Sequence, residues 1–315
     1  MTFLLLLINI VSGIMLASYY RPSAPYRSVS YITENVEFGL LTRSVHHWSA
    51  YLLIFLMLIH VLRSLFQGRY RVSRRSWIVG SLMGLVILGC SFTGSLLIWD
   101  QRAYWATIIG INTVETIPYV GGALKAFLLG GPEVTPITIG RFYALHTLML
   151  PAFLAVLMIV HLSSFNQLWE FLFDLLRRVG IVGTREKGNL KEMDATGVSS
   201  LVLELMEIFA TIGVILVLAS LFAPDMGEKA NPLVTPPHVK PEWYFLFIYQ
   251  GLKYVPKVVG VVLFFSVVPL LIILLPLLDR GPSLAIHPGK RPLATILVLL
   301  VLGALFSLTI LGWLA

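Results

Sequence analysis

Four histidines lie in two long apolar segments of the sequence and are spaced as haem ligands would be. His46 and His60 are 14 residues apart in one segment, and His146 and His161 are 15 apart in another. An α-helix turns about 100° and rises about 1.5 Å per residue, so each pair shares a helix face, with roughly 21–23 Å between its members. Two such helices facing each other predict two bis-histidine haem sites, one near each membrane surface.

The composition indicates that the chain is embedded in a lipid bilayer. Of 315 residues, 57% are hydrophobic and only 12% are charged, a balance foreign to soluble globular domains of this size. The apolar segments predict an all-α membrane protein with seven transmembrane helices, arranged as a four-helix dihaem bundle plus a three-helix C-terminal part. The predicted spans are residues 3–20, 45–66, 77–99, 142–165, 200–223, 257–278 and 293–314.

Cysteine content and charge exclude several classes of chemistry. The single cysteine, Cys90, excludes an intrachain disulfide, a multi-cysteine metal site and the C-x-x-C-H attachment of a covalent haem. The net charge of +7 does not indicate nucleic-acid binding, because basic loops commonly flank membrane spans. Basic residues are densest in the second–third, fourth–fifth and sixth–seventh connections, which predicts that these three face the cytoplasm.

This topology makes the second and fourth spans parallel. His46 is therefore predicted to pair with His146 near the outer surface, and His60 with His161 near the inner surface. Both haems would be six-coordinate, and bis-histidine iron carries electrons without binding oxygen. A histidine proton relay is the alternative interpretation for any one of these residues.

Glycines and arginines near the histidines could support a haem. Glycine lets helices approach a flat macrocycle closely, and Gly80 and Gly94 repeat the step of 14 residues, while Gly13 would face the outer haem. Ordinary helix packing would explain the same glycines. Arginines near the ligands could pair with propionates or could be snorkelling interfacial residues. They are Arg43 and Arg141 on the outer side and Arg63 on the inner side.

A short motif between the fifth and sixth spans places a carboxylate among aromatic residues at the membrane boundary. It reads Pro241, Glu242, Trp243 and Tyr244. A quinol must lose protons as it loses electrons, and a carboxylate in a partly desolvated pocket can accept one. An interfacial aromatic belt with an incidental glutamate would explain the same residues. The motif alone leaves both interpretations open.

Together, this motif and the two histidine pairs resemble the cytochrome b subunit of quinol–cytochrome c oxidoreductases over essentially all 315 residues. Four segments resemble the chloroplast-type branch in particular: Tyr19-Tyr20-Arg21-Pro22, Arg43-Ser44-Val45-His46, Trp99-Asp100-Gln101 and Arg141-Phe142-Tyr143. In that branch the haem-binding part and the motif-bearing part are separate chains. Here they are fused, which predicts a haem bundle at 1–170, a cytoplasmic-side linker at 171–199 and a three-helix part at 200–315.

The resemblance implies a division of labour. A quinol at an outer site would give one electron to a Rieske iron–sulfur protein and the other, through two non-covalent b-type haems, to an inner quinone, with proton translocation. Glu242 and Tyr244 would be catalytic there. The site would be lined by Pro241, Trp243, Tyr104 and Trp105, the last two from surface helices of the third–fourth loop.

The resemblance also implies partners and a location. They are a Rieske protein, a cytochrome c-type subunit, membrane lipid and a second copy of the complex, with no nucleic acid. The expected location is a bacterial plasma membrane or a photosynthetic membrane, which the chain crosses several times.

Two departures from the resemblance carry further expectations. Chloroplast-type proteins have a cysteine near the start of the first helix for an extra covalent haem, and this chain has none there. The first span is short and lacks an amphipathic lead-in, so the natural protein is expected to begin upstream of Met1, with a glycine about one repeat before Gly13.

Two other functional classes stay open. A polytopic transporter with a histidine proton relay predicts no visible absorption. A haem b membrane anchor of a dehydrogenase or hydrogenase keeps the haems but has no use for the motif at 241–244.

Overall fold

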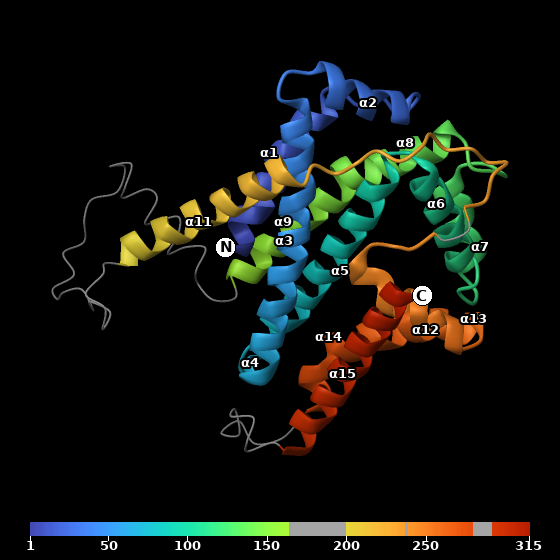
Figure 1. Cartoon of the computed structure of the whole chain (residues 1–315). Helices are drawn as coiled ribbons and strands as arrows, with labels where there is room; N and C mark the ends of the chain where they lie inside the picture. The colour runs from blue at the N-terminus through green and yellow to red at the C-terminus, as the bar shows by residue number, and fades with distance from the viewer. Residues whose placement is uncertain (164–199, 237–238, 280–291) are drawn as a thin grey trace.

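A computed structural model of the chain describes residues 1–163, 200–236, 239–279 and 292–315 (Figure 1). These residues form helices and irregular segments, and Asp100 and Lys229 form an isolated antiparallel β-bridge among them. Five helices are long and apolar enough to cross a bilayer, and two shorter apolar helices accompany them. The predicted all-α membrane class is therefore confirmed, and each predicted span contains an apolar helix.

The first half of the chain forms the helices α1 (Thr2–Ala17), α2 (Pro25–Asn35), α3 (Gly39–Phe66), α4 (Arg69–Val72), α5 (Arg74–Leu96), α6 (Gln101–Val114), α7 (Gly121–Leu129), α8 (Pro136–Ala144), the π-turn η1 (Leu145–Met149) and α9 (Leu150–Ser163). The second half forms α11 (Ser200–Leu221), the 3₁₀ turn η2 (Trp243–Phe245), α12 (Leu246–Tyr254), α13 (Lys257–Val262), the π-turn η3 (Leu263–Val267), α14 (Val268–Leu278) and α15 (Pro292–Leu314). The predicted linker at 171–199 lies outside the described residues.

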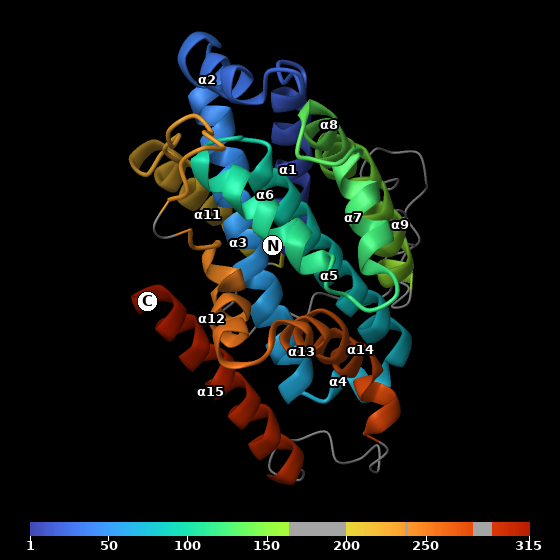
Figure 2. The same ribbon diagram turned by 90° about the vertical axis from the view of Figure 1, so that its right-hand side faces the viewer.

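Four of these helices form a bundle: α1 packs along α3, and α5 packs along α9 (Figures 1 and 2). Their shared core is largely aliphatic. Leu5 and Ile54 join α1 to α3, and Met83 and Leu154 join α5 to α9. This bundle holds all four histidines of the sequence prediction.

One end of the bundle carries α2 and the surface helices α6 and α7, and we call it the outer end, after the predicted orientation (Figure 1). A second hydrophobic cluster fixes α6 and α7 there, through Leu96, Ile111, Leu129 and Phe142. The surface helices of the third–fourth connection were expected, whereas α2 was not. In addition, α8 begins at Pro136, so Arg141 is part of the fourth long helix and not of a loop.

The connector from α11 to η2, drawn in orange, crosses the outer end and reaches α6 before it returns to α12 (Figure 1). Asp100 caps α6 by accepting from the amide of Ala103 at 2.8 Å, and its other oxygen accepts from Gly227 of the connector at 3.3 Å. The side chain of Gln101 accepts from the amide of Asn231 at 2.6 Å. These contacts fasten the motif-bearing part to the haem-bundle part.

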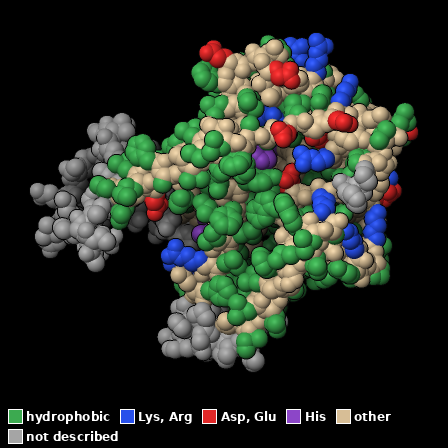
Figure 3. Space-filling model, in the orientation of Figure 1, with side chains coloured by type: hydrophobic (Ala, Val, Ile, Leu, Met, Phe, Trp, Pro, Cys, Tyr) green, Lys and Arg blue, Asp and Glu red, His purple; other side chains and the backbone are tan. Residues whose placement is uncertain are grey.

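The C-terminal helices α12, α14 and α15 lie beside the inner half of the bundle (Figures 1 and 2). On α5, Trp77 donates its indole N–H to the carbonyl of Ile272 at 2.7 Å. Tyr70 of α4 donates to the Asp279 carboxylate at 2.6 Å. The view of this face in Figure 3 shows charged groups over α2, α6 and α7 and near α4, with a largely hydrophobic surface between them. That distribution suits a chain embedded in lipid.

Candidate functional site

His46 on α3 and His146 in η1 face each other at the outer end of the bundle. Their ring centroids are 6.2 Å apart, and the ring planes are at 84°. A metal–imidazole bond is about 2 Å and a ring atom lies about 1.1 Å from its centroid, so two imidazoles on one iron have centroids about 6 Å apart. The pair therefore fits the two axial positions of a six-coordinate haem iron.

Both rings are held through Nδ1, which leaves Nε2 for a metal. The Nδ1 of His46 lies 3.1 Å from the carbonyl oxygen of Asn9 and 3.0 Å from the hydroxyl of Ser12. The Nδ1 of His146 lies 2.9 Å from the carbonyl oxygen of Cys90. Because a carbonyl only accepts, Nδ1 carries the proton, and the unprotonated Nε2 is the ring atom that is free to bind a metal.

Glycines on neighbouring helices make room for these rings. A Cβ atom at Gly13 would lie 3.1 Å from Cε1 of His46, and one at Gly94 would lie 2.6 Å from Cε1 of His146. The second distance is too short for any real side chain unless the ring or the helix moves. The predicted glycines thus lie directly against the candidate ligands and fix how closely α1 and α5 approach them.

The inner pair repeats half of this arrangement. A Cβ atom at Gly80 would lie 3.0 Å from Cε1 of His161, and the Nδ1 of that histidine lies 3.1 Å from the carbonyl oxygen of Ser76. The same pattern therefore occurs twice on α5, where a carbonyl and the glycine four residues after it both lie against one histidine. Ser76 and Gly80 do so at His161, and Cys90 and Gly94, 14 residues later, at His146. His60, on the opposite helix, is exposed among the described residues.

A π-turn explains why the two histidine steps differ. The turn η1 contains His146, and it adds one residue to the helix relative to a regular α-helical path. Pro151 has no N–H to give to the carbonyl of Thr147, which is a known cause of such turns. With the extra residue discounted, the step from His146 to His161 equals 14 regular residues, the same as from His46 to His60.

One cavity of about 840 Å³ is lined by both outer histidines and by two residues of the motif, Glu242 and Tyr244. Its volume lies within the range of cofactor and ligand pockets. His46, His146, Glu242 and Tyr244 all line it, and most of the remaining wall is apolar. The geometry thus brings an electron-carrier site and a proton-accepting group to the same space.

Hydroxyl groups of two helices hold the motif in place. Tyr51 of α3 donates a hydrogen bond to the carboxylate of Glu242, and the hydroxyls of Tyr244 and Ser91 of α5 share another. Burial raises the pKa of Tyr244 above its ordinary value, so its hydroxyl stays protonated at physiological pH. Pro241 and Trp243 were predicted to line the site, but neither lines the cavity. The centroid of the Trp243 ring lies 6.5 Å from that of Tyr51.

Of the three predicted arginines, Arg43 is buried and lines the outer cavity. Arg63 is exposed on α3, beyond His60. The prediction that Arg141 pairs with a haem propionate is corrected, because its guanidinium donates to the carbonyls of Ala126, at 3.2 Å, and Phe127. Those carbonyls end α7 and attract a cation, so the side chain points away from the propionate position expected for it.

Tyr104 and Trp105 of α6 are also placed differently from the prediction, because neither lines the cavity. The indole N–H of Trp105 donates to the carbonyl of Val234 at 3.1 Å, so this residue fastens the connector. Arg102 of the same helix lines the cavity instead. Other lining residues that the sequence analysis did not predict are Tyr51, Ser91, Tyr20 and Tyr143.

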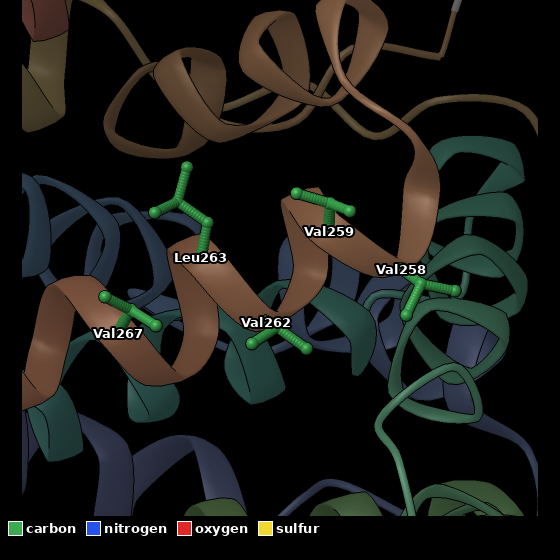
Figure 4. Close-up of a pocket in the computed structure, with 5 residues that line it drawn as sticks. All are labelled: Val258, Val259, Val262, Leu263 and Val267. Carbon is green, nitrogen blue, oxygen red and sulfur yellow. The ribbon is translucent and has the colours of Figure 1, made fainter.

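A smaller hollow of about 310 Å³ lies along α13 and η3, and Figure 4 shows the side chains that line it. All are aliphatic: Val258, Val259, Val262, Leu263 and Val267. None of them can transfer a proton or bind a metal, so this hollow is suited to lipid chains and not to chemistry.

An α-helical bundle with facing histidines at one end, open to a carboxylate held by hydroxyls, defines a membrane-bound redox protein. Comparison with known proteins identifies its kind. The family model for cytochrome b/b6/petB matches residues 1–168, and the model for cytochrome b(C-terminal)/b6/petD matches residues 229–315. The chain therefore belongs to the cytochrome b/b6 family.

Three relatives support this assignment. The menaquinol:cytochrome c reductase cytochrome b subunit of Geobacillus thermodenitrificans is 41% identical over 187 residues, which are 58% of this chain and 79% of that protein. The cytochrome bc complex cytochrome b subunit of Chlorobaculum thiosulfatiphilum is 33% identical over 306 residues, 95% of this chain and 68% of that protein. A solved structure titled "Hyperthermophilic respiratory Complex III" matches 99% of this chain and 82% of its own, with a TM-score of 0.80 and 28% identity.

The predicted family, function and enzyme class are confirmed. The protein is the cytochrome b of a bc-type complex, an integral membrane subunit of a quinol–cytochrome c type oxidoreductase. It binds b-type haem as members of this family do, and it works with other subunits. The transporter and the dehydrogenase-anchor alternatives are set aside by this membership.

Proposed function

We propose that this subunit oxidises quinol in the outer cavity, with Glu242 accepting a proton from the quinol hydroxyl. The observation that carries the proposal is the shared cavity, which Glu242 and Tyr244 line together with His46 and His146. A quinol bound there would have both a carboxylate and a candidate electron-acceptor site in the wall of its own cavity. The apolar remainder of the wall suits a quinone ring and excludes water.

We further propose two non-covalent b-type haems, of which His46 and His146 would hold the outer one and His60 and His161 the inner one. Bound there, haem supplies one-electron carriage between the two membrane surfaces and leaves no open position on iron for oxygen. The chain itself fixes the ligand tautomers through backbone carbonyls. Arg43 is the proposed partner for a propionate of the outer haem, since it is buried in the same cavity.

The proposed assembly follows from membership of a bc-type complex. A Rieske iron–sulfur protein would receive the first electron at the outer end, a cytochrome c-type subunit would follow it, and the complex would be a homodimer. A quinone at the inner end would receive the second electron and take up protons. We retain 1–170 as the haem-binding region and 200–315 as the region that carries the motif, joined by 171–199.

Glu242→Gln tests the proposal in the assembled complex. Quinol oxidation should slow by about 10²-fold, the lower end of what a positioned base contributes, because water can partly substitute. Both haem spectra should be unchanged, since the connector holds no ligand. Glu228→Gln is the matched control, because it makes the same change in an exposed side chain of the same connector.

Turnover of Glu242→Gln within about twofold of the wild type, in a normally assembled complex, would show that the proton leaves by another route. Loss of haem or of the Rieske protein would instead assign Glu242 an anchoring role.

A further inference from the structure

The carboxylate of Glu242 has a specific partner in the bundle. Its hydrogen bond comes from the hydroxyl of Tyr51, on α3, 191 residues away in the sequence. Within the part of the chain that the structure describes, no lysine, arginine or histidine forms an ion pair with Glu242. The hydroxyl of the neighbouring phenol, Tyr244, forms a hydrogen bond with Ser91.

Aromatic neighbours fix the direction of the Tyr51 hydroxyl. The centroid of its ring lies 4.3 Å from that of His47, with the planes tilted by 35°, and 5.9 Å from that of Tyr244, with the planes at 84°. Trp48 and Trp243 pack at 5.7 Å and 6.5 Å. A ring enclosed on several sides keeps one rotamer, so its hydroxyl points steadily at the connector.

We propose that Tyr51 is the positioning residue for Glu242 and that it holds the carboxyl group at the cavity wall both before and after the carboxyl group takes a proton from quinol. This inference rests on the proposed function of Glu242 and adds a second residue to it. Tyr51 acts through Glu242 and need not contact the quinol.

The chemistry of the phenol suits this task. A hydroxyl is both a donor and an acceptor, so it donates to the ionised carboxylate and can accept from the carboxylic acid. The hydrogen bond therefore survives proton uptake with its direction reversed. A lysine or arginine partner would stabilise the ionised form alone and would oppose protonation. A neutral phenol holds Glu242 without that opposition.

Tyr51→Phe removes the hydroxyl and keeps the ring that packs against His47, Trp48, Trp243 and Tyr244. In the intact complex, kcat for quinol oxidation should fall about tenfold, less than the loss from Glu242→Gln, because the base remains but is misplaced. KM and both haem spectra should be unchanged. In redox-induced infrared difference spectra, the carboxylic C=O band assigned by Glu242→Gln should move to higher wavenumber, because a hydrogen bond is lost.

A double variant separates positioning from a general effect. If Tyr51 acts only through Glu242, the Tyr51→Phe, Glu242→Gln complex should turn over at the rate of Glu242→Gln alone. Tyr26→Phe is the control for loosening of the connector: its hydroxyl donates to the carbonyl of Gly227 at 3.0 Å, and its loss should leave the Glu242 band in place.

Two results would overturn the proposal in distinguishable ways. Multiplicative rate effects in the double variant, or an unshifted Glu242 band in Tyr51→Phe, would remove the role of Tyr51 while the role of Glu242 stands. Normal turnover of Glu242→Gln would remove the proposed function itself, and the role of Tyr51 with it.

Discussion

The outer and inner ends of the haem bundle are alike in how they hold a histidine and different in what surrounds it. On α5, Cys90 with Gly94 and Ser76 with Gly80 offer the same carbonyl and glycine to His146 and His161. At the outer end alone, among the described residues, a cavity joins the histidines to Glu242. Ligand positioning is thus a property of the repeating helices, whereas the reaction site is added by the connector.

The largest expected effect tests whether the two ends are independent haem sites. His146→Leu should remove the outer haem and stop quinol oxidation, because the cavity then lacks an electron carrier. His60→Leu should remove the inner haem and spare more of the outer one. Reduced-minus-oxidised spectra and haem content check both variants. Retention of two low-spin b haems in either variant would contradict the ligand assignment.

Substituting alanine for Gly94, at the outer end of the bundle, should lower stability more than the same change at Gly80, at the inner end. At Gly94 the added Cβ would lie 2.6 Å from the His146 ring, whereas at Gly80 it would lie 3.0 Å from that of His161. Overpacking costs about 1–3 kcal/mol and alanine regains roughly 1 kcal/mol of helix propensity, so Gly94→Ala should lower stability and Gly80→Ala should be close to neutral. Thermal unfolding and haem content measure the difference.

Gly84→Ala is the matched control on the same helix, since its Cβ would lie 3.5 Å from the nearest side-chain atom, in ordinary contact. It should keep the haems and gain stability. Equal losses at Gly80, Gly84 and Gly94 would show that the close approach to the rings has no special role.

The smallest expected effect concerns the connector. Gln101→Ala removes a side chain that accepts from the amide of Asn231 at 2.6 Å and donates to the carbonyls of Asn231 and Val234. A net loss of about 1 kcal/mol in how the connector is held corresponds to a roughly fivefold rise in KM for quinol. The haems should be unaffected. The inner-side counterpart, Asp279→Asn, alters the contact with Tyr70 and should leave that KM unchanged. Equal KM values in Gln101→Ala and the wild type would show that this contact does not shape the outer site.

Much of the fold follows from the sequence, because a bilayer requires long apolar helices and the chain has few other apolar runs. The predicted span at 257–278 has the same limits as α13 to α14. The starts of α3 and α8 were placed six residues too late, at 45 and 142, because their first turns are helical but polar enough to fall outside an apolar segment. Apolar residues thus indicate which part of a helix lies in the membrane, whereas hydrogen bonding determines where the helix begins and ends.

The candidate site was only partly predictable. The histidine pairs and the motif have spacing or composition that indicates chemistry, but Tyr51 and Arg102 have neither, and only the packing of distant segments brings them to the cavity. One signal was available for Tyr51: it lies four residues after His47, on the same helix face. The misplacement of Arg141 came from treating closeness to His146 in sequence as closeness in space, whereas Tyr104 was assigned from the resemblance of its loop.

The shared outer cavity is the central claim, and ligand-induced spectral change tests it most directly. In the His161→Leu complex the outer haem should be the only one left, and a quinone analogue that blocks quinol oxidation can be titrated against its reduced spectrum. The account predicts a saturable shift of the outer haem band, with half-saturation at the concentration that halves turnover in the wild-type complex. An unchanged spectrum at an analogue concentration that fully blocks turnover would contradict it.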